Sequence, residues 1–311
     1  THVYAEQGIY SISMTGKVRN IDWSLVKTEV PSCTAMKVTH IDQLGNLSYN
    51  SNMLNSFCKP LVNLNSFRIG ETDFSDYKNI AEMFRGAESL RKIDLSGFRP
   101  TTNTSGSSVR TSFFQDCNKL NKIVNLENIQ THQSTAFNNM FLNCDKLEPD
   151  VGFFNTSLAT NMSKMFECTE VPYTGPNWTD KPPYPRRYLN VGGFETSNVT
   201  NMSNMFAHNY NVEILDVADW DVSNVTVMYG MFKHCQSINE LDLTNWDTSK
   251  VTNMSNMFNL AGLNFGWEAL ADPLNELKYT NFKGIENFNL TSLENWEDGN
   301  GNLISPLADF F

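Results

Sequence analysis

The sequence predicts an α/β solenoid: a leucine-rich-repeat-like stack of about eight coils, with a parallel β-sheet on one face and a capping segment at each end. Two observations lead to this prediction. One nine-residue motif recurs at a nearly constant period, and the residues after each copy alternate between apolar and polar. A unit of this length cannot enclose a core alone, but stacked units bury one continuous core.

The period is set by the phenylalanine that ends each copy of the motif. NVTNMSNMF ends at Phe206, and related copies end at Phe232 and Phe258, each 26 residues further on. The spacings between successive copies are 30, 30, 27, 25, 40, 26 and 26 residues, which indicates eight units, one of them with an insertion. The weaker upstream copies end at Leu54, Phe84, Phe114, Phe141 and Phe166.

Each unit is expected to fold as a short strand, a turn, a single helical or 3₁₀ turn, and a second turn. The strand follows from alternating segments such as ELDL at Glu240–Leu243. The segment DTSKVT is rich in side chains that bond nearby backbone amides, and MSNMF leaves room for one helical turn at most. Equivalent strands then pair in parallel about 4.8 Å apart. The repeated Met and Phe form interior columns, and Leu95, Val217 and Leu243 face the interior.

Three regions follow from where the period holds. Residues 46–262 are predicted to form the solenoid, with an insertion at 169–188. Residues 1–45 are expected to form an N-terminal β cap and residues 263–311 a C-terminal cap.

The two ends carry different patterns from the middle. Alternation over Thr1–Gly16 predicts a hairpin or strand pair. Helical spacing near the C-terminus predicts a short capping helix. Because the chain begins at Thr1 instead of Met, we expect a processed or truncated product whose export signal has been lost. The residues with helical spacing are Trp267, Leu270, Leu274 and Leu277.

The composition narrows the class of partner. The net charge is −11, from 34 acidic and 23 basic residues, which argues against nucleic acid and against an anionic membrane. No segment approaches the ~18 consecutive apolar residues of a membrane span, so we expect no membrane insertion.

The six cysteines are expected to be mostly reduced thiols in the core. Cys117, Cys144 and Cys235 each lie three residues after the repeat phenylalanine, and a place fixed within the repeat indicates packing. A disulfide between stacked Cys117 and Cys144 is the alternative.

The repeat resembles a known family. LDLTNWDTSKVTNMSNMF at Leu241–Phe258 and FKHCQSINELDL at Phe232–Leu243 resemble the BspA-like leucine-rich repeats of bacterial surface proteins. HVYAEQGIYSISMTG at His2–Gly16 resembles the closing strands of PKD-like or Ig-like modules, so residues 1–45 are also a candidate for the end of such a module. The resemblance implies exposure on a bacterial cell surface, adhesion to proteins or host cells, and occasional use in phage virions. It implies no catalytic residue.

The sequence contains no recognisable catalytic or cofactor-binding motif, so we expect neither an enzymatic activity nor a cofactor. No Gly-rich phosphate loop and no Ser-His-Asp or Cys-His motif is visible. His208 and His234 lie at the same place in adjacent units and are weak candidates for a metal, but a metal site normally needs three or four ligands, so a polar turn is the favoured interpretation.

Five repeated aspartates invite a calcium hypothesis, because stacked carboxylates repel one another and a cation relieves that repulsion. The glycine patterns of known calcium loops are missing, so turn-forming aspartates are favoured. These residues are Asp94, Asp216, Asp221, Asp242 and Asp247.

The insertion is the predicted partner site. Its sequence, TEVPYTGPNWTDKPPYPRRY, carries five prolines together with the residue types enriched at binding hot spots. The alternative is a surface loop whose aromatic residues cover the solenoid. The candidate binding residues are Tyr173, Trp178, Tyr184, Arg186, Arg187 and Tyr188.

We therefore expect a non-enzymatic, surface-exposed adhesion module on a bacterial cell, which docks a protein or glycan of a host or neighbouring cell. The alternative is a virion-surface protein of a phage, a fibre or decoration subunit whose partners are neighbouring virion subunits. Both functions are extracellular, and the sequence does not separate them.

Overall fold

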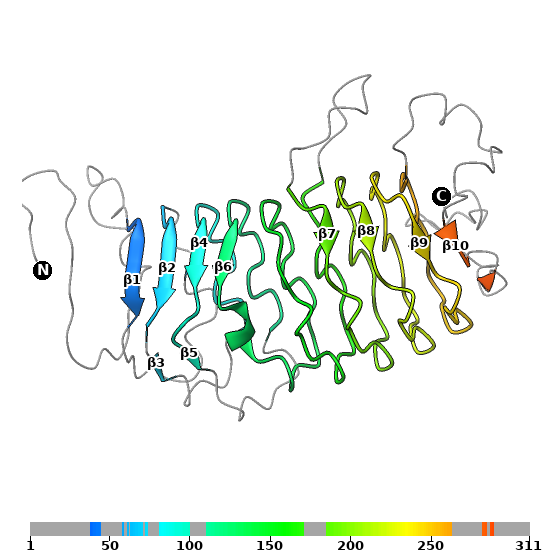
Figure 1. The fold of residues 1–311 in the computed structure, drawn as a ribbon, viewed down its shortest axis with the longest axis horizontal. Helices are drawn as coiled ribbons and strands as arrows, with labels where there is room; N and C mark the ends of the chain where they lie inside the picture. Colours follow the sequence, from blue (N-terminus) through cyan, green and yellow to red (C-terminus); the bar gives the residue numbers. More distant parts are fainter. Residues whose placement is uncertain are drawn as a thin grey trace, which may run out of the picture.

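In the computed structural model, the chain winds into a parallel β-solenoid whose strands lie side by side along its axis (Figure 1). The structure describes residues 38–44, 58, 61, 63–70, 72–73, 81–99, 110–170, 185–262, 282–284 and 287–288. Within these ranges the buried residues form a single core cluster that runs through the stack.

The strands pair in parallel from coil to coil. Four strands form one sheet in the order β1-β2-β4-β6, and β7 pairs with β8 and β9 with β10. A parallel bridge between Ile214 and Glu240 joins β8 to β9. A second small sheet pairs β3 with β5. The bounds are β1 His40–Leu44, β2 Ser66–Ile69, β3 Thr72–Asp73, β4 Lys92–Asp94, β5 Phe98–Arg99, β6 Lys122–Val124, β7 Tyr188–Leu189, β8 Ile214–Leu215, β9 Leu241–Asp242 and β10 Phe282–Lys283.

The predicted parallel solenoid is confirmed, but its α/β character is not. In the described part of the chain the only helix is the 3₁₀ helix η2 at Leu126–Ile129. The count of eight coils is also not confirmed, since Leu54 of the first unit lies outside the described residues. Leu95, Val217 and Leu243 are buried, as predicted.

The predicted caps lie largely outside the described residues. Neither the hairpin at Thr1–Gly16 nor the helix around Trp267–Leu277 falls within them. At the N-terminal side, β1 begins inside the predicted cap and pairs in parallel with β2. The sheet therefore extends into the region assigned to the cap.

The motif that ends in phenylalanine does not form a helical turn, which corrects the prediction for this segment. In each coil the residue two places before the phenylalanine has a positive φ, and in most coils so does the residue two places after it. Such left-handed residues break a right-handed helix. The segment is instead a series of turns, as between Asn204 (φ 53°) and His208 (φ 61°) around Phe206.

This alternation directs every second N–H group toward the next coil. Asn204, Phe206 and His208 donate their backbone N–H groups to the carbonyls of Tyr229 (2.7 Å), Met231 (3.0 Å) and Lys233 (2.7 Å). The intervening N–H groups close turns within the coil. The same arrangement repeats around Phe84, Phe114, Phe141 and Phe232.

The repeat phenylalanines stack face to face along the axis. Ring centroids of Phe206 and Phe232 lie 5.8 Å apart, and those of Phe232 and Phe258 lie 5.6 Å apart, each pair tilted by 10°. These distances fall in the range of favourable aromatic pairs. The column runs without a break through Phe84, Phe114, Phe141, Phe166, Phe206, Phe232 and Phe258.

A second aromatic column contains Phe194, Trp220 and Trp246. Trp220 stacks between Phe194 (6.1 Å) and Trp246 (6.5 Å). The indole N–H of Trp220 donates to the carbonyl of Val191, and that of Trp246 to the carbonyl of Val217. Each indole therefore satisfies its one polar group with the backbone of the preceding coil.

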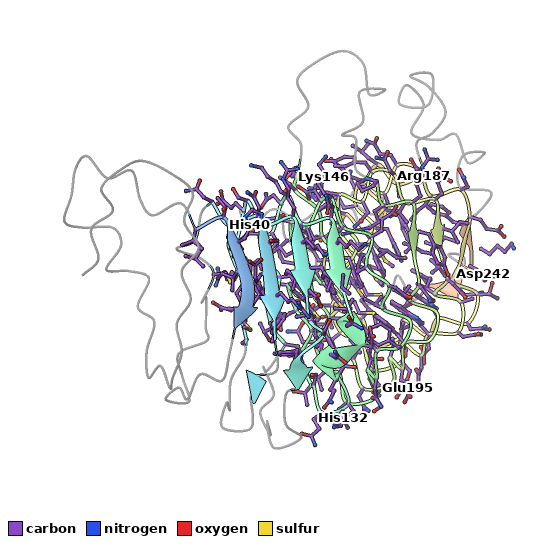
Figure 2. All side chains as sticks on the ribbon, turned by 60° about the vertical axis from the view of Figure 1, so that its left-hand side comes forward. His40, His132, Lys146, Arg187, Glu195 and Asp242 are labelled. Atoms are coloured by element: carbon purple, nitrogen blue, oxygen red, sulfur yellow. The ribbon has the colours of Figure 1, made fainter. Side chains whose placement is uncertain are left out.

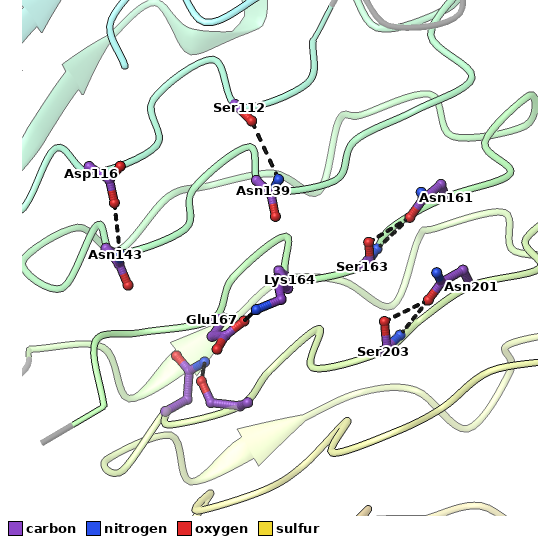
Figure 3. A network of polar contacts seen from close by, with 12 residues as sticks. Ser112, Asp116, Asn139, Asn143, Asn161, Ser163, Lys164, Glu167, Asn201 and Ser203 are labelled. Carbon is purple, nitrogen blue, oxygen red and sulfur yellow. Dashed lines mark hydrogen bonds and ion pairs between the residues drawn. The ribbon is translucent and has the colours of Figure 1, made fainter. Parts of the chain in front are cut away.

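Short polar side chains hold the outer turns, in the row seen in Figure 3. The side-chain oxygen of Asn201 accepts the N–H (2.9 Å) and the hydroxyl (2.7 Å) of Ser203. Asn161 accepts the same two bonds from Ser163, and the two asparagines form a parallel bridge. The repeated Asn and Ser are therefore turn residues, as the sequence indicates.

The predicted thiols are confirmed for the five cysteines that the structure describes, all of which are free and buried. Cys33 lies outside the described residues. The thiols of Cys117, Cys144 and Cys235 donate to the carbonyl of the repeat phenylalanine in the preceding coil at 3.0–3.1 Å. Burial raises the pKa of each of these three thiols.

We predict that replacing the central ring of the column destabilises the whole stack. Phe232→Ala removes a buried ring that contacts a coil on each side, so the free energy of unfolding should fall by roughly 3–5 kcal/mol in urea denaturation. The matched control is Leu158→Ala, because Leu158 is 49 % exposed. Equal losses in the two variants would contradict the assignment of inside and outside.

Candidate functional site

The predicted partner site is only partly described. The structure shows its first residues, Thr169 and Glu170, and its last, from Pro185 to Tyr188. Three of the candidate binding residues, Tyr173, Trp178 and Tyr184, lie outside the described residues. Their binding role stays a prediction.

Arg186 lies inside the solenoid and is only 1 % exposed. Its guanidinium donates to the carbonyls of Leu147 (3.0 Å), Phe166 (3.0 Å) and Cys144 (3.2 Å). It also donates to the side-chain oxygen of Asn209 at 2.8 Å. A charged group with this many buried acceptors stabilises the fold.

The position of Arg186 follows from the interrupted coil. In the coil that carries the insertion, Cys168 occupies the place where neighbouring coils have a left-handed residue, and its φ is not positive. Asn209 takes the place of the repeat cysteine and donates to the carbonyl of Phe166, as the thiols do elsewhere. Arg186 therefore binds carbonyls around this irregularity, which favours a structural role over the predicted contact with a partner.

Arg187 and Tyr188 lie on the outer face of the sheet. Tyr188 pairs in register with Ile214, and their side chains are 51 % and 58 % exposed. Arg187 forms an ion pair of 2.9 Å with Glu213 beside them. Figure 2 shows Arg187 near the edge of the solenoid opposite Glu195. β7 and β8 thus expose an apolar pair, Tyr188 and Ile214, and the ion pair of Arg187 and Glu213 lies beside it.

Ile214 is a binding candidate that the sequence prediction missed. The signal was present, because Ile214 is an apolar residue at the outward position of a strand whose inward residue is Leu215. Its partner across the register, Tyr188, lies at the far end of the insertion, so the pair becomes visible only in the fold.

His208 and His234 lie next to each other in adjacent coils, as predicted, with their ring planes at 71° in an edge-to-face contact. Their ring centroids lie 4.8 Å apart, and Nδ1 of His208 lies 3.2 Å from the hydroxyl of Tyr210. Burial, with the neighbouring His234, lowers the pKa of His208 to about 3. Burial, with Lys233, lowers the pKa of His234 to about 4.

The two histidines occupy left-handed turn positions, where other coils have Gly86, Asp116 and Asn143. This fits the favoured interpretation as polar turn residues. Across the described ranges no group of three or more His, Cys, Asp or Glu is arranged to hold a metal ion. In the same ranges no helix is long and apolar enough to cross a membrane.

Four of the five repeated aspartates make turns, which supports the favoured hypothesis for them. Asp94 accepts the N–H of Ser96 at 2.9 Å together with its hydroxyl. Asp242 accepts both groups of Thr244, at 3.1 Å and 2.7 Å. The hydrogen bonds from Ser96 and Thr244 lower the pKa of these two carboxyls. Asp221 and Asp247 accept the N–H of Ser223 and Ser249 in the same way.

We predict that the two adjacent arginines differ sharply in their effect on stability. Arg186→Met removes four buried hydrogen bonds that a charged donor makes to oxygen atoms of Leu147, Phe166, Cys144 and Asn209, so the free energy of unfolding should fall by about 3 kcal/mol or more. Arg187→Met removes an exposed ion pair and should cost less than about 1 kcal/mol. Chemical denaturation of both variants measures the difference. Similar values for the two would show that Arg186 does not bridge the interrupted coil.

We also predict an acid-sensitive contribution from the histidine pair. Both folded-state pKa values lie below the ordinary 6.5, so the unfolded chain binds protons first. The stabilising contribution is complete above about pH 7 and declines as pH falls from about 6.5 toward 4. Between pH 7.5 and 5 the pair should lose about 2 kcal/mol, after allowance for solvent screening.

The matched variant is His208→Asn with His234→Asn, because Asn143 occupies the same left-handed position in another coil. Its urea midpoint should change less than that of the wild type between pH 7.5 and 5. The same pH dependence in both proteins would contradict the assignment.

The comparisons identify a family. The model described as "Mycoplasma protein of unknown function, DUF285" matches residues 51–178 and 186–296, more than three-quarters of the chain. The unmatched gap lies within the insertion. No curated protein and no solved structure matches the chain. On the family match, the chain belongs to the DUF285 family.

Proposed function

We propose that this protein is a non-enzymatic binding module that docks a partner on the outer face of its sheet at β7 and β8. The observation that carries the proposal is the exposed, in-register pair of Tyr188 and Ile214. The proposal places the protein outside the cell, on a bacterial surface, in line with the BspA-like resemblance of its repeats. A phage virion surface is the alternative location.

The chemistry of this patch suits a protein partner. Tyr and Arg are enriched at binding hot spots, and they act best where neighbouring groups exclude water around an apolar centre. Tyr188 and Ile214 supply that centre. Arg187 and Glu213 flank it and form an exposed ion pair, which suits the polar rim of an interface.

The insertion ends at this patch. Its last two residues are Arg187 and Tyr188, which joins the partner site predicted from the sequence to the face of the sheet. A solenoid face is long and regular, and a coil that departs from the repeat distinguishes one place on it.

The nucleophilic groups of the described core are unsuited to catalysis, which supports a binding function. Burial raises the pKa of Cys168 to about 11 and raises that of Cys58 further. A thiol that stays protonated is a poor nucleophile. The expected absence of enzymatic activity stays a prediction.

We predict that the apolar pair is required for binding. Beads coated with the protein are tested for adhesion to beads coated with the same protein, to cultured epithelial cells and to a glycan array. Tyr188→Ser with Ile214→Ser should reduce bead adhesion at least tenfold, because both changes remove apolar area from the centre of the interface. The melting temperature should stay nearly unchanged, since both side chains are exposed.

The control is Leu158→Ser, which removes an apolar side chain of similar exposure from a turn. It should adhere as the wild type does. Full adhesion by the double variant would rule out the β7–β8 patch, and equal losses in the double variant and the control would point to general surface hydrophobicity.

A further inference from the structure

The outer face of the sheet is divided by charge along the solenoid axis. From β2 to β6, the described outward residues carry four basic groups against one acidic group, Asp94. None of the residues on this half is an exposed large hydrophobic. The basic residues are Arg68, Arg91, Lys92 and Lys122.

The other half of the same face is acidic. From the segment that follows β6 in the stack to β9, the described outward residues carry six acidic groups against one basic group, Arg187. The exposed pair Tyr188 and Ile214 lies within this half. The acidic residues are Glu148, Asp150, Glu213, Asp216, Glu240 and Asp242.

The signs also reverse at the ends of the sheet. Asp42 on β1 is acidic beside the basic half, and Lys283 on β10 is basic beside the acidic half. The first charged residue beyond each half therefore has the opposite sign to that half. Toward its two ends, this face is therefore complementary in charge to a second copy turned end for end.

We propose that the partner of the β7–β8 patch is a second copy of this chain, which docks face to face and end for end; this inference rests on the proposed function. The two-fold axis runs parallel to the strands and reverses the order of the coils. It passes near the segment between β6 and β7, so β4 of one copy faces β8 of the other, and β2 faces β9. At equal height along the strands, Arg68 then faces Asp242 and Arg91 faces Glu213, whereas Asp94 faces Asp216 and the segment with Glu148 and Asp150 faces its own copy. Opposite charges therefore meet toward the ends of the interface. Such an interface is isologous and closed, as in most homodimers.

This arrangement also covers the apolar pair. Ile214 of one copy meets the region of Lys92, and Tyr188 meets the region of Lys122, because residues at the same height along the strands face each other. Lysine side chains pack their methylene stems on apolar surface and place their ammonium groups near aromatic faces. The methylene stems of the two lysines thus cover the apolar pair.

The test uses two charge-reversed proteins. The first, Arg91→Glu with Lys92→Glu and Lys122→Glu, gives both halves of the face a net negative charge. The second, Glu213→Lys with Asp216→Lys and Glu240→Lys, gives both halves a net positive charge. In sedimentation equilibrium at 50 mM NaCl, the wild type should form particles of twice 35.3 kDa. Each variant should dimerise at least tenfold more weakly, and their equimolar mixture should recover a one-to-one dimer.

Two controls guard the result. Glu127→Lys with Glu195→Lys and Asp219→Lys reverses three exposed acidic residues away from the sheet face and should dimerise as the wild type does. The second control is the wild type at higher salt. Raising NaCl from 50 to 500 mM should weaken its dimer at least tenfold, because salt screens exposed charges.

A monomeric wild type at 200 μM and 50 mM NaCl would overturn the proposal. So would dimers that persist in both charge-reversed proteins, or a mixture that forms no one-to-one dimer. A monomeric wild type whose bead adhesion still depends on Tyr188 and Ile214 leaves the proposed function standing and assigns the patch to a different partner. A wild type that dimerises but does not adhere would support the proposed self-association and contradict the proposed adhesion.

Discussion

The alternating backbone on either side of each repeat phenylalanine is the constraint on which the solenoid depends. A left-handed residue before the ring, and in most coils another after it, turn every second N–H group along the axis, as at Asn204 and His208 around Phe206. Every coil is thereby hydrogen-bonded to the next at a fixed register. The short strands add few bonds of their own, since most described strands have two to four residues.

Because this corner fixes the spacing, the side chains it carries must recur. Phenylalanine rings stack at 5.4–5.9 Å along the column, and a cysteine thiol or the Asn209 amide donates to the carbonyl of the preceding ring residue. The coil that carries the insertion is less regular than its neighbours. There Cys168 lacks the positive φ although its N–H still bonds to the Ala207 carbonyl of the next coil, and Arg186 supplies donors to the nearby carbonyls of Phe166 and Cys144.

The sequence alone was sufficient to predict the features that depend on the period of the repeat. It predicted the parallel stack, the phenylalanine column and the buried thiols, because a residue fixed within a repeat has one environment. It failed for MSNMF, since Met254 and Met257 suit a helical turn and the observed corner equally well. It also placed Arg186 at a binding surface, because arginine in a proline-rich insertion resembles an exposed contact. Its burial depends on carbonyls from two coils and on the Asn209 side chain of a third, which only the fold brings together.

The corner conformation itself is tested most directly by the free energy of unfolding of Asn139→Gly and Asn139→Val, measured side by side. Asn139 has a φ of 59°. If that backbone is required, glycine should stay within about 1 kcal/mol of the wild type, whereas valine should lose about 1–3 kcal/mol more than glycine. A helical turn would give the opposite order, because valine is a better helix former than glycine. Valine equal to or more stable than glycine would contradict the account.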